Sequence, residues 1–195
     1  AASTLDRMLC QFTGTNAPNE DQIDDFLRWK LDHLYLFDFV GSIDQFKVVA
    51  LCRYAKKIGC DHIIIDSLAK CTGAEDNYAE QKSFINALAE VAKEVKLHVH
   101  LVHHARKGGD ESKRINKFDV KGSGVLVDLA DNLILVSRNK EKEAQTKITG
   151  LKDNTIPDQF LDVAKQRHGN WEGLIDLWFD MRTFTYTESF CPTFS

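Results

Sequence analysis

The sequence predicts an α/β fold, with a mostly parallel sheet, flanking helices and an antiparallel hairpin extension at the C-terminal end. Segments with the apolar period of a helix alternate with short β-branched runs, which are typical of buried parallel strands. From Asp158 onward, two strand-like segments flank a Gly/Asn turn, which indicates antiparallel strands. The alternation of helix and strand favours helices on both faces of the parallel sheet.

The composition indicates one domain. With 195 residues, 43% of them hydrophobic and 28% charged, the chain can bury its own core, and it contains no repeat or linker that would divide it. The net charge of -4 argues against electrostatic attraction of the whole protein to nucleic acid, so any contact with nucleic acid must be local. Five cysteines without a CxxC pair or zinc spacing indicate reduced, mostly packed thiols: Cys10, Cys52, Cys60, Cys71 and Cys191.

The longest apolar runs, such as residues 133–136, are far too short to span a bilayer. The chain does not open with the basic and then apolar pattern of a signal peptide. We therefore expect no membrane partner. The expected compartment is the cytoplasm of a bacterium or of a phage-infected host cell, with the mitochondrial matrix as the less favoured alternative.

The first helix–strand unit covers residues 45–66. Its apolar residues recur with helical period over 45–58, and Gly59 suits a helix C-cap. "HIIID" follows as a buried strand that ends at Asp66.

The second unit covers residues 77–104. Asn77 and Glu80 have the spacing of a capping box, and they open a helix with an apolar face that includes Phe84 and Leu88. "LHVHLVHH" then predicts another strand, and "LADNLILVSR" predicts a third. The tail predicts antiparallel strands over 158–167, 171–180 and 183–187.

Polar residues follow two of these strands, at the sheet edge where ligands of open α/β sheets bind. Asp66 is a candidate magnesium ligand acting through the ion's water shell, and equally a candidate N-cap of the next helix. His103 and His104 end the next strand, and alternation allows only one of them to face a ligand easily. An isolated histidine in such a place is more often a packing residue, but His104 lies nearer to the following loop.

A long polar loop runs from residue 106 to residue 121 ahead of "GSG". It is either a solvated surface loop or a contact for a phosphate backbone. Its six cations are Arg106, Lys107, Lys113, Arg114, Lys117 and Lys121. Gly122, within "KGSG", allows close backbone approach.

Lys165 and Arg167 lie two residues apart before the last hairpin turn. On a strand, this spacing points both side chains to one face, continuing the row of Leu161 and Val163. The pair fits either a functional cationic tip or a strand edge guarded by charge against aggregation.

Four segments, taken in order, carry a family resemblance: "IIIDSLAK", "HLVHHARKG", "DVKGSGVLVDLADNLILVSRNK" and "VAKQRHGNWEGLIDLWFD". They resemble the motor domain of replicative hexameric DNA helicases, the DnaB family with its phage primase-helicase and mitochondrial Twinkle relatives. The resemblance implies a RecA-like core that hydrolyses ATP or another NTP with Mg²⁺ at subunit interfaces. It also implies a homo-oligomeric, hexameric ring that pulls single-stranded DNA through its centre.

The resemblance also implies roles for single residues. Asp66 is similar to the Walker B aspartate that positions Mg²⁺, and His104 to a polar sensor of the terminal phosphate. Arg138 and Tyr186 correspond to positions at the nucleotide. The cationic loop and Gly122 correspond to the DNA loop of the central channel. Lys165 and Arg167 are similar to the lysine and the arginine finger that reach a neighbouring subunit's site, so we expect Arg167 to be exposed in a monomer.

Two departures from the family pattern stand out. The sequence contains no GxxxxGK[ST], so we expect the Walker A strand and loop, and the catalytic glutamate, to lie outside this chain. Residues 1–195 are then a single RecA-like helicase C-terminal domain, incomplete at the N-terminus and inactive alone. In addition, Asp128 replaces a glutamine of the family, which exchanges a neutral donor for an acceptor.

Two alternatives retain the fold. One is a catalytically dead RecA-like module that regulates a helicase ring through the face of Lys165 and Arg167. The other is a RecA-type ATPase that does not unwind DNA.

Overall fold

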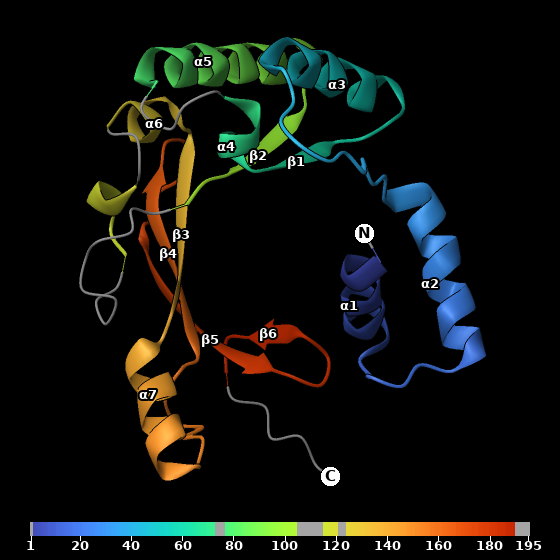
Figure 1. Cartoon of the computed structure of the whole chain (residues 1–195), viewed down its shortest axis with the longest axis vertical. Coiled ribbons are helices and arrows are strands. Elements are labelled where there is room, and N and C mark those ends of the chain that lie inside the picture. Colours follow the sequence, from blue (N-terminus) through green and yellow to red (C-terminus); the bar gives the residue numbers. More distant parts are fainter. Residues whose placement is uncertain (1, 73–76, 105–114, 121–123, 190–195) are drawn as a thin grey trace.

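The computed structural model describes residues 2–72, 77–104, 115–120 and 124–189. Helices α3 (Gln45–Lys57) and α5 (Tyr78–Val95) lie side by side over a small sheet of β1 (His62–Asp66) and β2 (His98–Val102) (Figure 1). A longer sheet extends away from this layer and consists of β3 (Asn132–Arg138), β4 (Gln159–Gln166), β5 (Gly173–Asp180) and β6 (Thr185–Thr187).

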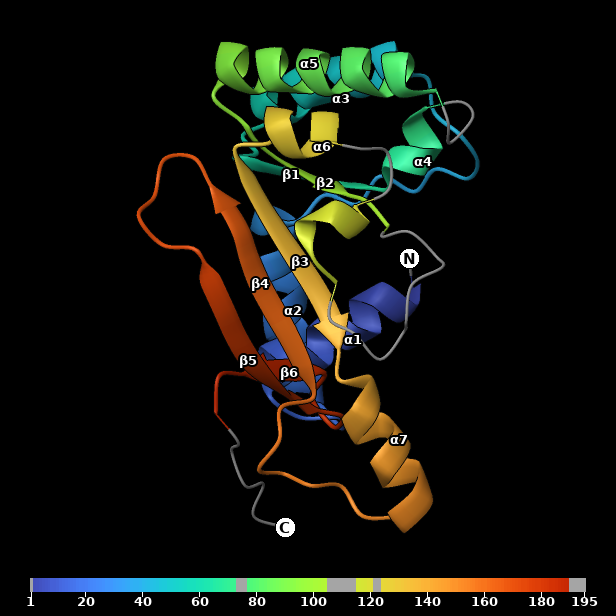
Figure 2. The ribbon, with the colours of Figure 1, turned by 90° about the vertical axis from the view of Figure 1, so that its left-hand side faces the viewer.

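The remaining helices surround these two sheets. Helices α1 (Ala2–Thr13) and α2 (Glu20–His33) pack on each other beside the long sheet, and α7 (Lys140–Thr149) lies at its far end (Figures 1 and 2). The short helices α4 (Leu68–Cys71) and α6 (Gly124–Leu129) and the 3-10 turn η1 (Lys117–Asp119) lie near the small sheet. Within the described residues, no helix combines the length and apolar character that crossing a membrane requires.

Local chemistry explains the helix ends that the sequence predicts. The side chain of Asp44 accepts hydrogen bonds from the N–H groups of Phe46 and Lys47, and so begins α3. After α3, Gly59 has φ +98°, a conformation that residues with a side chain rarely adopt. Asn77 begins α5 by accepting from the N–H of Glu80. The predicted helix starts and the glycine stop are therefore confirmed.

The core lies between helices α3 and α5 and one face of the small sheet. β1 and β2 are parallel, with His62 opposite His98 and Asp66 opposite Val102, as the sequence predicts. Ile63 and Ile65 face the helices, where they pack with the apolar side of α5. The buried residues of this core are Val48, Cys52, Ile65, Leu68, Cys71, Phe84, Leu88, Val91 and Leu97.

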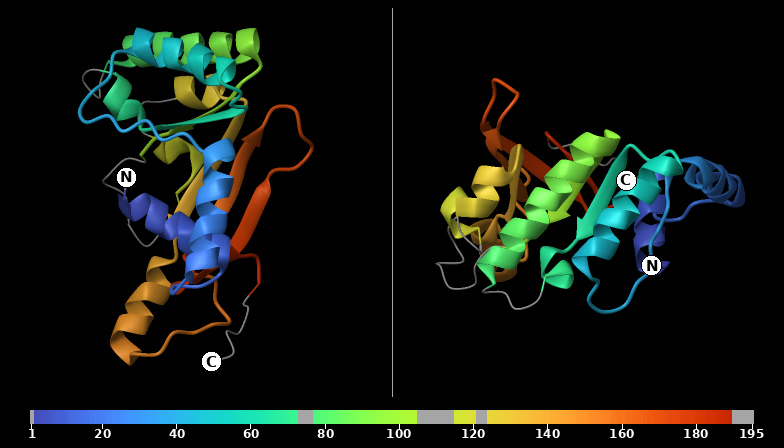
Figure 3. Two further views of the ribbon diagram at one scale, coloured as in Figure 1. Left: turned by 90° about the vertical axis from the view of Figure 1, so that its right-hand side faces the viewer. Right: turned by 90° about the horizontal axis from the view of Figure 1, so that it is seen from above.

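Helices cover only one face of this parallel pair among the described residues (Figure 3). The opposite face is exposed and carries the alternate residues of both strands, among them Ile64, which is 72% exposed. The prediction of helices on both faces is therefore wrong for the described part of the chain, in which α1 and α2 pack on each other.

The second sheet is antiparallel throughout, in the order β3-β4-β5-β6. Its presence confirms the predicted antiparallel extension and, with the parallel pair, the α/β class. The parallel part is smaller than expected from the sequence. The segment expected as a third parallel strand, β3, pairs along its whole length with β4.

The described cysteines are free thiols. Cys52 and Cys71 are buried, and burial raises the pKa of both thiols. Cys191 lies outside the described residues.

Candidate functional site

Asp66 ends β1 with its side chain exposed. Within the described residues its carboxylate has no hydrogen bond or ion pair. The N-cap of α4 is Ser67, so Asp66 does not act as the helix cap that the sequence left open. The peptide bond between Asp66 and Ser67 is cis. Because its side chain is exposed, the carboxylate is accessible at the carboxyl end of a parallel strand.

His104 lies at the same edge of the small sheet. Asp66 is opposite Val102 in the register, and His104 follows two residues later. His104 is exposed and His103 is half-buried, which agrees with the expectation that only one of the two faces solvent. Its role as a phosphate sensor stays a prediction.

This edge fits one side of a magnesium–nucleotide site. Magnesium takes one or two carboxylates together with waters and substrate phosphates, and an accessible carboxylate such as Asp66 meets that need. Across the described residues, no group of three or more His, Cys, Asp or Glu could hold a metal ion by itself. Further ligands would have to come from the nucleotide and from residues elsewhere.

Lys165 and Arg167 are held by the C-terminal end of α6. The Lys165 Nζ donates to the carbonyl oxygens of Val127 and Asp128, at 2.7 and 3.0 Å. The Arg167 Nη2 donates to the same Asp128 oxygen at 2.7 Å, and its Nη1 pairs with the Asp131 carboxylate at 2.8 Å. The last carbonyls of a helix lack partners within the helix and attract cations. Both side chains therefore converge on one acceptor.

The strand that carries these cations is not regular. The register with β3 shifts between Leu133 and Ile134, so that Leu133 is opposite Lys165, Ile134 is opposite Val163, and Ala164 has no partner. This irregularity interrupts the apolar row that the sequence predicts to run into Lys165. Both cations still donate to the same Asp128 oxygen. The Arg167 side chain is 42% exposed, which confirms the expectation of an exposed arginine.

Arg138 and Tyr186 lie at the other end of the antiparallel sheet. Arg138 is opposite Gln159, whereas Asn132, at the start of the same strand, is opposite Gln166 near the hairpin tip. Seven residues separate these ends by about 20 Å. The ring of Tyr186 lies against that of Phe179 in a tilted arrangement, with centroids 4.7 Å apart. The structure thus separates Arg138 from the Arg167 end of the sheet.

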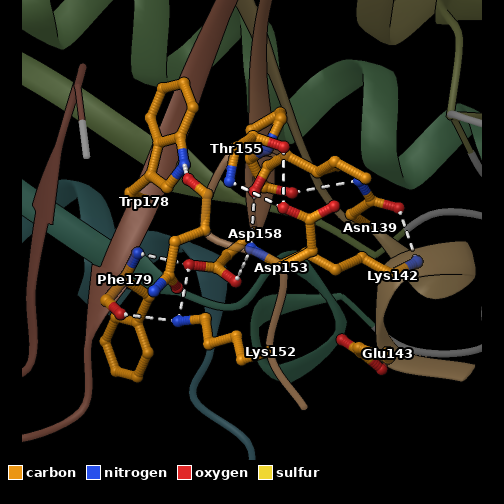
Figure 4. Close-up of polar contacts among 12 residues, drawn as sticks. Asn139, Lys142, Glu143, Lys152, Asp153, Thr155, Asp158, Trp178 and Phe179 are labelled. Atoms are coloured by element: carbon orange, nitrogen blue, oxygen red, sulfur yellow. Dashed lines mark hydrogen bonds and ion pairs between the residues drawn. The ribbon is translucent and has the colours of Figure 1, made fainter. Parts of the chain in front are cut away.

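A polar network fixes the connection that follows Arg138 (Figure 4). Lys142, only 4% exposed, pairs with Asp158 at 2.8 Å and donates to the carbonyl oxygen of Ile156. The other carboxylate oxygen of Asp158 accepts from Lys152 Nζ at 2.9 Å and from the Phe179 N–H at 2.8 Å. Burial by itself raises the pKa of Asp158, but the hydrogen bonds from Lys142, Phe179 and Lys152 outweigh it and hold this pKa below its usual value.

Arg138 itself pairs with the first turn of α7. Its Nε lies 2.6 Å from the Glu143 carboxylate, and its side chain is 62% exposed. Its place at a nucleotide base stays a prediction, as does that of Tyr186.

Most of the expected DNA loop falls outside the described residues. This applies to Arg106, Lys107, Lys113, Arg114, Lys121 and Gly122. Lys117 is described and begins the turn η1, where its side chain is exposed. The loop's role stays a prediction.

The two groups of candidate residues face different sides of the molecule. In Figure 2, the carboxyl ends of β1 and β2 point to the right, toward α4, while the turn between β4 and β5 lies on the left. In the described part of the chain, no hydrogen bond or ion pair joins Asp66 or His104 to Lys165 or Arg167. The cations therefore lie away from the Asp66 edge of their own chain.

Sequence reasoning missed two features. Asp131, which holds Arg167, could have been suspected because it directly precedes the strand that pairs with the hairpin. Three histidines also gather on the exposed face of the small sheet, with His62 Nδ1 3.1 Å from His100 Nε2 and the rings of His98 and His100 4.4 Å apart. Partial burial, then the charges of His98 and His62, lower the pKa of His100. The signal in the sequence was the two-residue period of the strands "HIIID" and "HVH", which places the three histidines on one face.

Comparisons with known proteins agree with this geometry. A protein-family model described as AAA domain matches residues 2–110, which is more than half of the chain. A DNA helicase/primase of Enterobacteria phage T3 is 24% identical over 119 residues, which cover 56% of this chain and 21% of the phage protein.

The fold also matches a solved structure. The chain is similar, with a TM-score of 0.73 and 16% identity, to a DnaB-like replicative helicase whose structure was determined together with its interactions with primase. The match covers 94% of this chain and 48% of that one, so the chain spans about half of the solved chain and about a fifth of the phage relative. These comparisons agree with the predicted resemblance: the family model shows an AAA domain, and the solved structure shows the fold.

Proposed function

The chain belongs to the AAA domain family, and from this premise we propose that it is part of the motor of an NTP-dependent replicative DNA helicase. In this proposal, the complete protein forms a hexameric ring and moves along single-stranded DNA. The proposal is made for the complete protein, because the chain spans only part of each relative. The phage relative also supports action in the cytoplasm of an infected host cell.

The observation that carries the proposal is the division of candidate residues between two sides of the molecule (Figure 2). Asp66 and His104 lie at the carboxyl edge of β1 and β2, and Arg167 lies at the opposite hairpin. Residues that act on one phosphate must lie within a few ångströms of it, so one chain does not supply both groups to one site. Adjacent copies in a ring can supply one group each.

The proposed roles follow from the chemistry of each side chain. Asp66 holds Mg²⁺ through water beside the nucleotide phosphates, where the ion neutralises phosphate charge. His104 hydrogen-bonds the terminal phosphate, while Arg138 and Tyr186 lie beside the base. Lys165 and Arg167 stabilise the charge that develops on the transferred phosphoryl group of the neighbouring site.

The charge distribution supports a local contact with DNA. The chain is acidic overall, yet six cations fall within residues 106–121. A single strand that passes this loop meets positive charge there. Lys117 is the described member of the set and is exposed.

Exposed apolar surface supports work within a larger assembly. A groove of about 380 Å³ beside α3 is lined by seven residues, and nearby Val40 is 92% exposed. Large exposed apolar patches on soluble proteins commonly mark contacts with further polypeptide. The residues that line the groove are Phe37, Phe39, Ile43, Lys47, Ala50, Leu51 and Tyr54.

Mixed rings of the complete protein test the proposal. We expect Asp66→Ala and Arg167→Ala to abolish NTP hydrolysis separately. A mixture of the two variants should regain part of the activity, because an Arg167→Ala subunit with an intact Asp66 can receive Arg167 from its Asp66→Ala neighbour. The control is a mixture of Arg167→Ala with the double variant Asp66→Ala/Arg167→Ala at the same ratio. Because neither protein supplies Arg167, this mixture should hydrolyse no more NTP than the two proteins hydrolyse separately.

Two outcomes would contradict the proposal. Recovery that is no greater than the sum of the separate variants would show that the groups do not meet across an interface. Absence of hydrolysis and of forked-DNA unwinding by the unmodified complete protein would remove the helicase assignment. We also expect the 195-residue chain alone not to hydrolyse NTP.

A further inference from the structure

We propose that Asp131 and the carbonyl end of α6 form a bracket that positions Lys165 and Arg167 for their action on a neighbouring subunit. The α6 bracket consists of the carbonyl oxygens of Val127 and Asp128 and the carboxylate of Asp131. This inference rests on the proposed function for its consequence, but its geometry stands on contacts within the chain. Asp131 is thereby assigned as a positioning residue.

The bracket fixes the Arg167 guanidinium in two directions. Arg167 Nη1 bonds the Asp131 carboxylate at 2.8 Å, and Nη2 bonds the Asp128 oxygen at 2.7 Å. The backbone is tied as well, since the Arg167 N–H donates to the Asp131 carbonyl oxygen at 2.8 Å. Two of the five guanidinium donors are used in this way, which leaves donors for a phosphate.

The bracket also brings the two cations together. Lys165 and Arg167 extend from successive alternate positions near the end of β4, and both donate to the Asp128 oxygen. Two like charges at one oxygen repel each other unless anionic partners compensate. The negative end of α6 and the Asp131 carboxylate supply that compensation. An anionic phosphate approaching the tip would then meet two cations in a defined arrangement.

The exposure of the Arg167–Asp131 pair argues against a purely stabilising role. The side chains of Arg167 and Asp131 are 42% and 45% exposed, and ion pairs that are this open to solvent add little to folding stability. A bracket of little value to the fold is nevertheless able to hold a reactive group in place. The two roles therefore predict different effects of the same substitution.

Asp131→Asn in the complete protein separates these roles. We expect kcat for NTP hydrolysis with single-stranded DNA to fall about 10- to 100-fold, because small displacements of a positioned group have effects of this size. KM should change less than twofold, and the unfolding temperature should stay within 2 degrees, about the scatter of a surface substitution. Asp131→Glu should recover part of kcat.

Glu94→Gln provides the matched control. Glu94 pairs with Arg53 through two hydrogen bonds at 3.0 and 2.7 Å, and both side chains are 51% exposed, so the pair resembles Arg167–Asp131 but lies on α3 and α5. We expect its kcat and unfolding temperature to equal those of the unmodified protein. A second measurement needs no activity: an arginine-selective dicarbonyl reagent should modify Arg167 several-fold faster in Asp131→Asn, with Arg53 unchanged.

The outcomes are distinct. A kcat of Asp131→Asn equal to that of the unmodified protein overturns the inference, and so does a loss of kcat that is accompanied by an equal loss in thermal stability. If the unmodified complete protein hydrolyses no NTP, the proposed function fails and the bracket is judged by the reagent alone. Equal modification rates of Arg167 in the two proteins would then overturn it.

Discussion

Lys142 and Asp158 form the least exposed ion pair among the described residues, with Nζ and Oδ1 2.8 Å apart and side chains that are 4% and 16% exposed. The pair joins the first turn of α7 to the start of β4, and Lys152 and the Phe179 N–H complete it from two further segments. Ion pairs of this kind are costly to break from one side, because the remaining charge stays buried.

Asp158→Asn should therefore lower the free energy of unfolding by about 2 to 3 kcal/mol, measured by urea denaturation. Lys142 would keep its bond to the Ile156 oxygen but lose its counter-ion. The exposed pair Arg53–Glu94 serves as comparison, and Glu94→Gln should leave the denaturation midpoint almost unchanged. Equal effects of the two substitutions would contradict the importance of burial here.

Acid should weaken the same network. The folded pKa of Asp158 lies below its unfolded value, so its contribution is fully present above the unfolded pKa and is lost as pH falls through the folded pKa. We expect the unmodified chain to lose stability steeply below about pH 4. In Asp158→Asn this part of the pH dependence should be absent, which denaturation at several pH values between 2 and 5 would measure.

The histidine cluster predicts a second, separate pH effect. Burial and the neighbouring charges of His98 and His62 lower the pKa of His100, so the folded state disfavours its protonation. Stability from this source is complete above the unfolded pKa, about 6.5, and declines as pH falls below it. His100→Asn should flatten the stability profile between pH 7 and 5. His33→Asn, on α2, is the matched control, and an equal flattening there would contradict the role of the cluster.

Arg167→Lys tests whether the guanidinium fork is needed or only its charge. Lysine keeps the charge but cannot bond Asp131, Asp128 and a phosphate in one plane. In the complete protein we expect kcat to fall about 10³-fold. Arg53→Lys should be neutral. Activity of Arg167→Lys within tenfold of the unmodified protein would mean that charge alone suffices.

If residues 106–121 bind DNA, their cations should determine how strongly the binding of single-stranded DNA depends on salt. Replacing Lys113, Arg114 and Lys117 by alanine should weaken binding of single-stranded DNA. It should also reduce the slope of log K against log salt by about 2, since each phosphate contact contributes about 0.7 for a single strand. Fluorescence anisotropy at four salt concentrations measures both quantities.

The control for this experiment removes the same charge from another surface. Lys82, Lys93 and Lys96 belong to α5 or follow it directly, and their replacement should leave the slope unchanged. If both triple variants change the slope equally, general charge rather than the loop governs binding.

Sequence reasoning located α3, α5 and the strands well, because their signals are local. A carboxylate at position 44, an asparagine at 77 and a glycine at 59 act on backbone groups within a few residues, and a continuous β-branched run marks β1 within five residues. The pairing of β3 was not predictable in this way. Whether a strand joins a parallel or an antiparallel neighbour depends on partners far along the chain, and here every residue of β3 pairs with β4.

The same distinction applies to the candidate site. The positions of Asp66 and His104 at a strand end follow from local pattern, and the structure agrees. The hydrogen-bond acceptors of Lys165 and Arg167 do not follow from local pattern. Two of the three acceptors are backbone oxygens, and the third, Asp131, lies 36 residues before Arg167 in the sequence. Side-chain types alone carry no record of such bonds.

The oxygen that Lys165 and Arg167 share belongs to the backbone of Asp128. Every amino acid offers that oxygen, so evolution is free to exchange the side chain at 128 without cost to the bracket. A substitution of the Asp128 side chain then needs no compensating change at 165 or 167. Position 131 has no such freedom, and across related sequences its carboxylate should vary together with the arginine it holds.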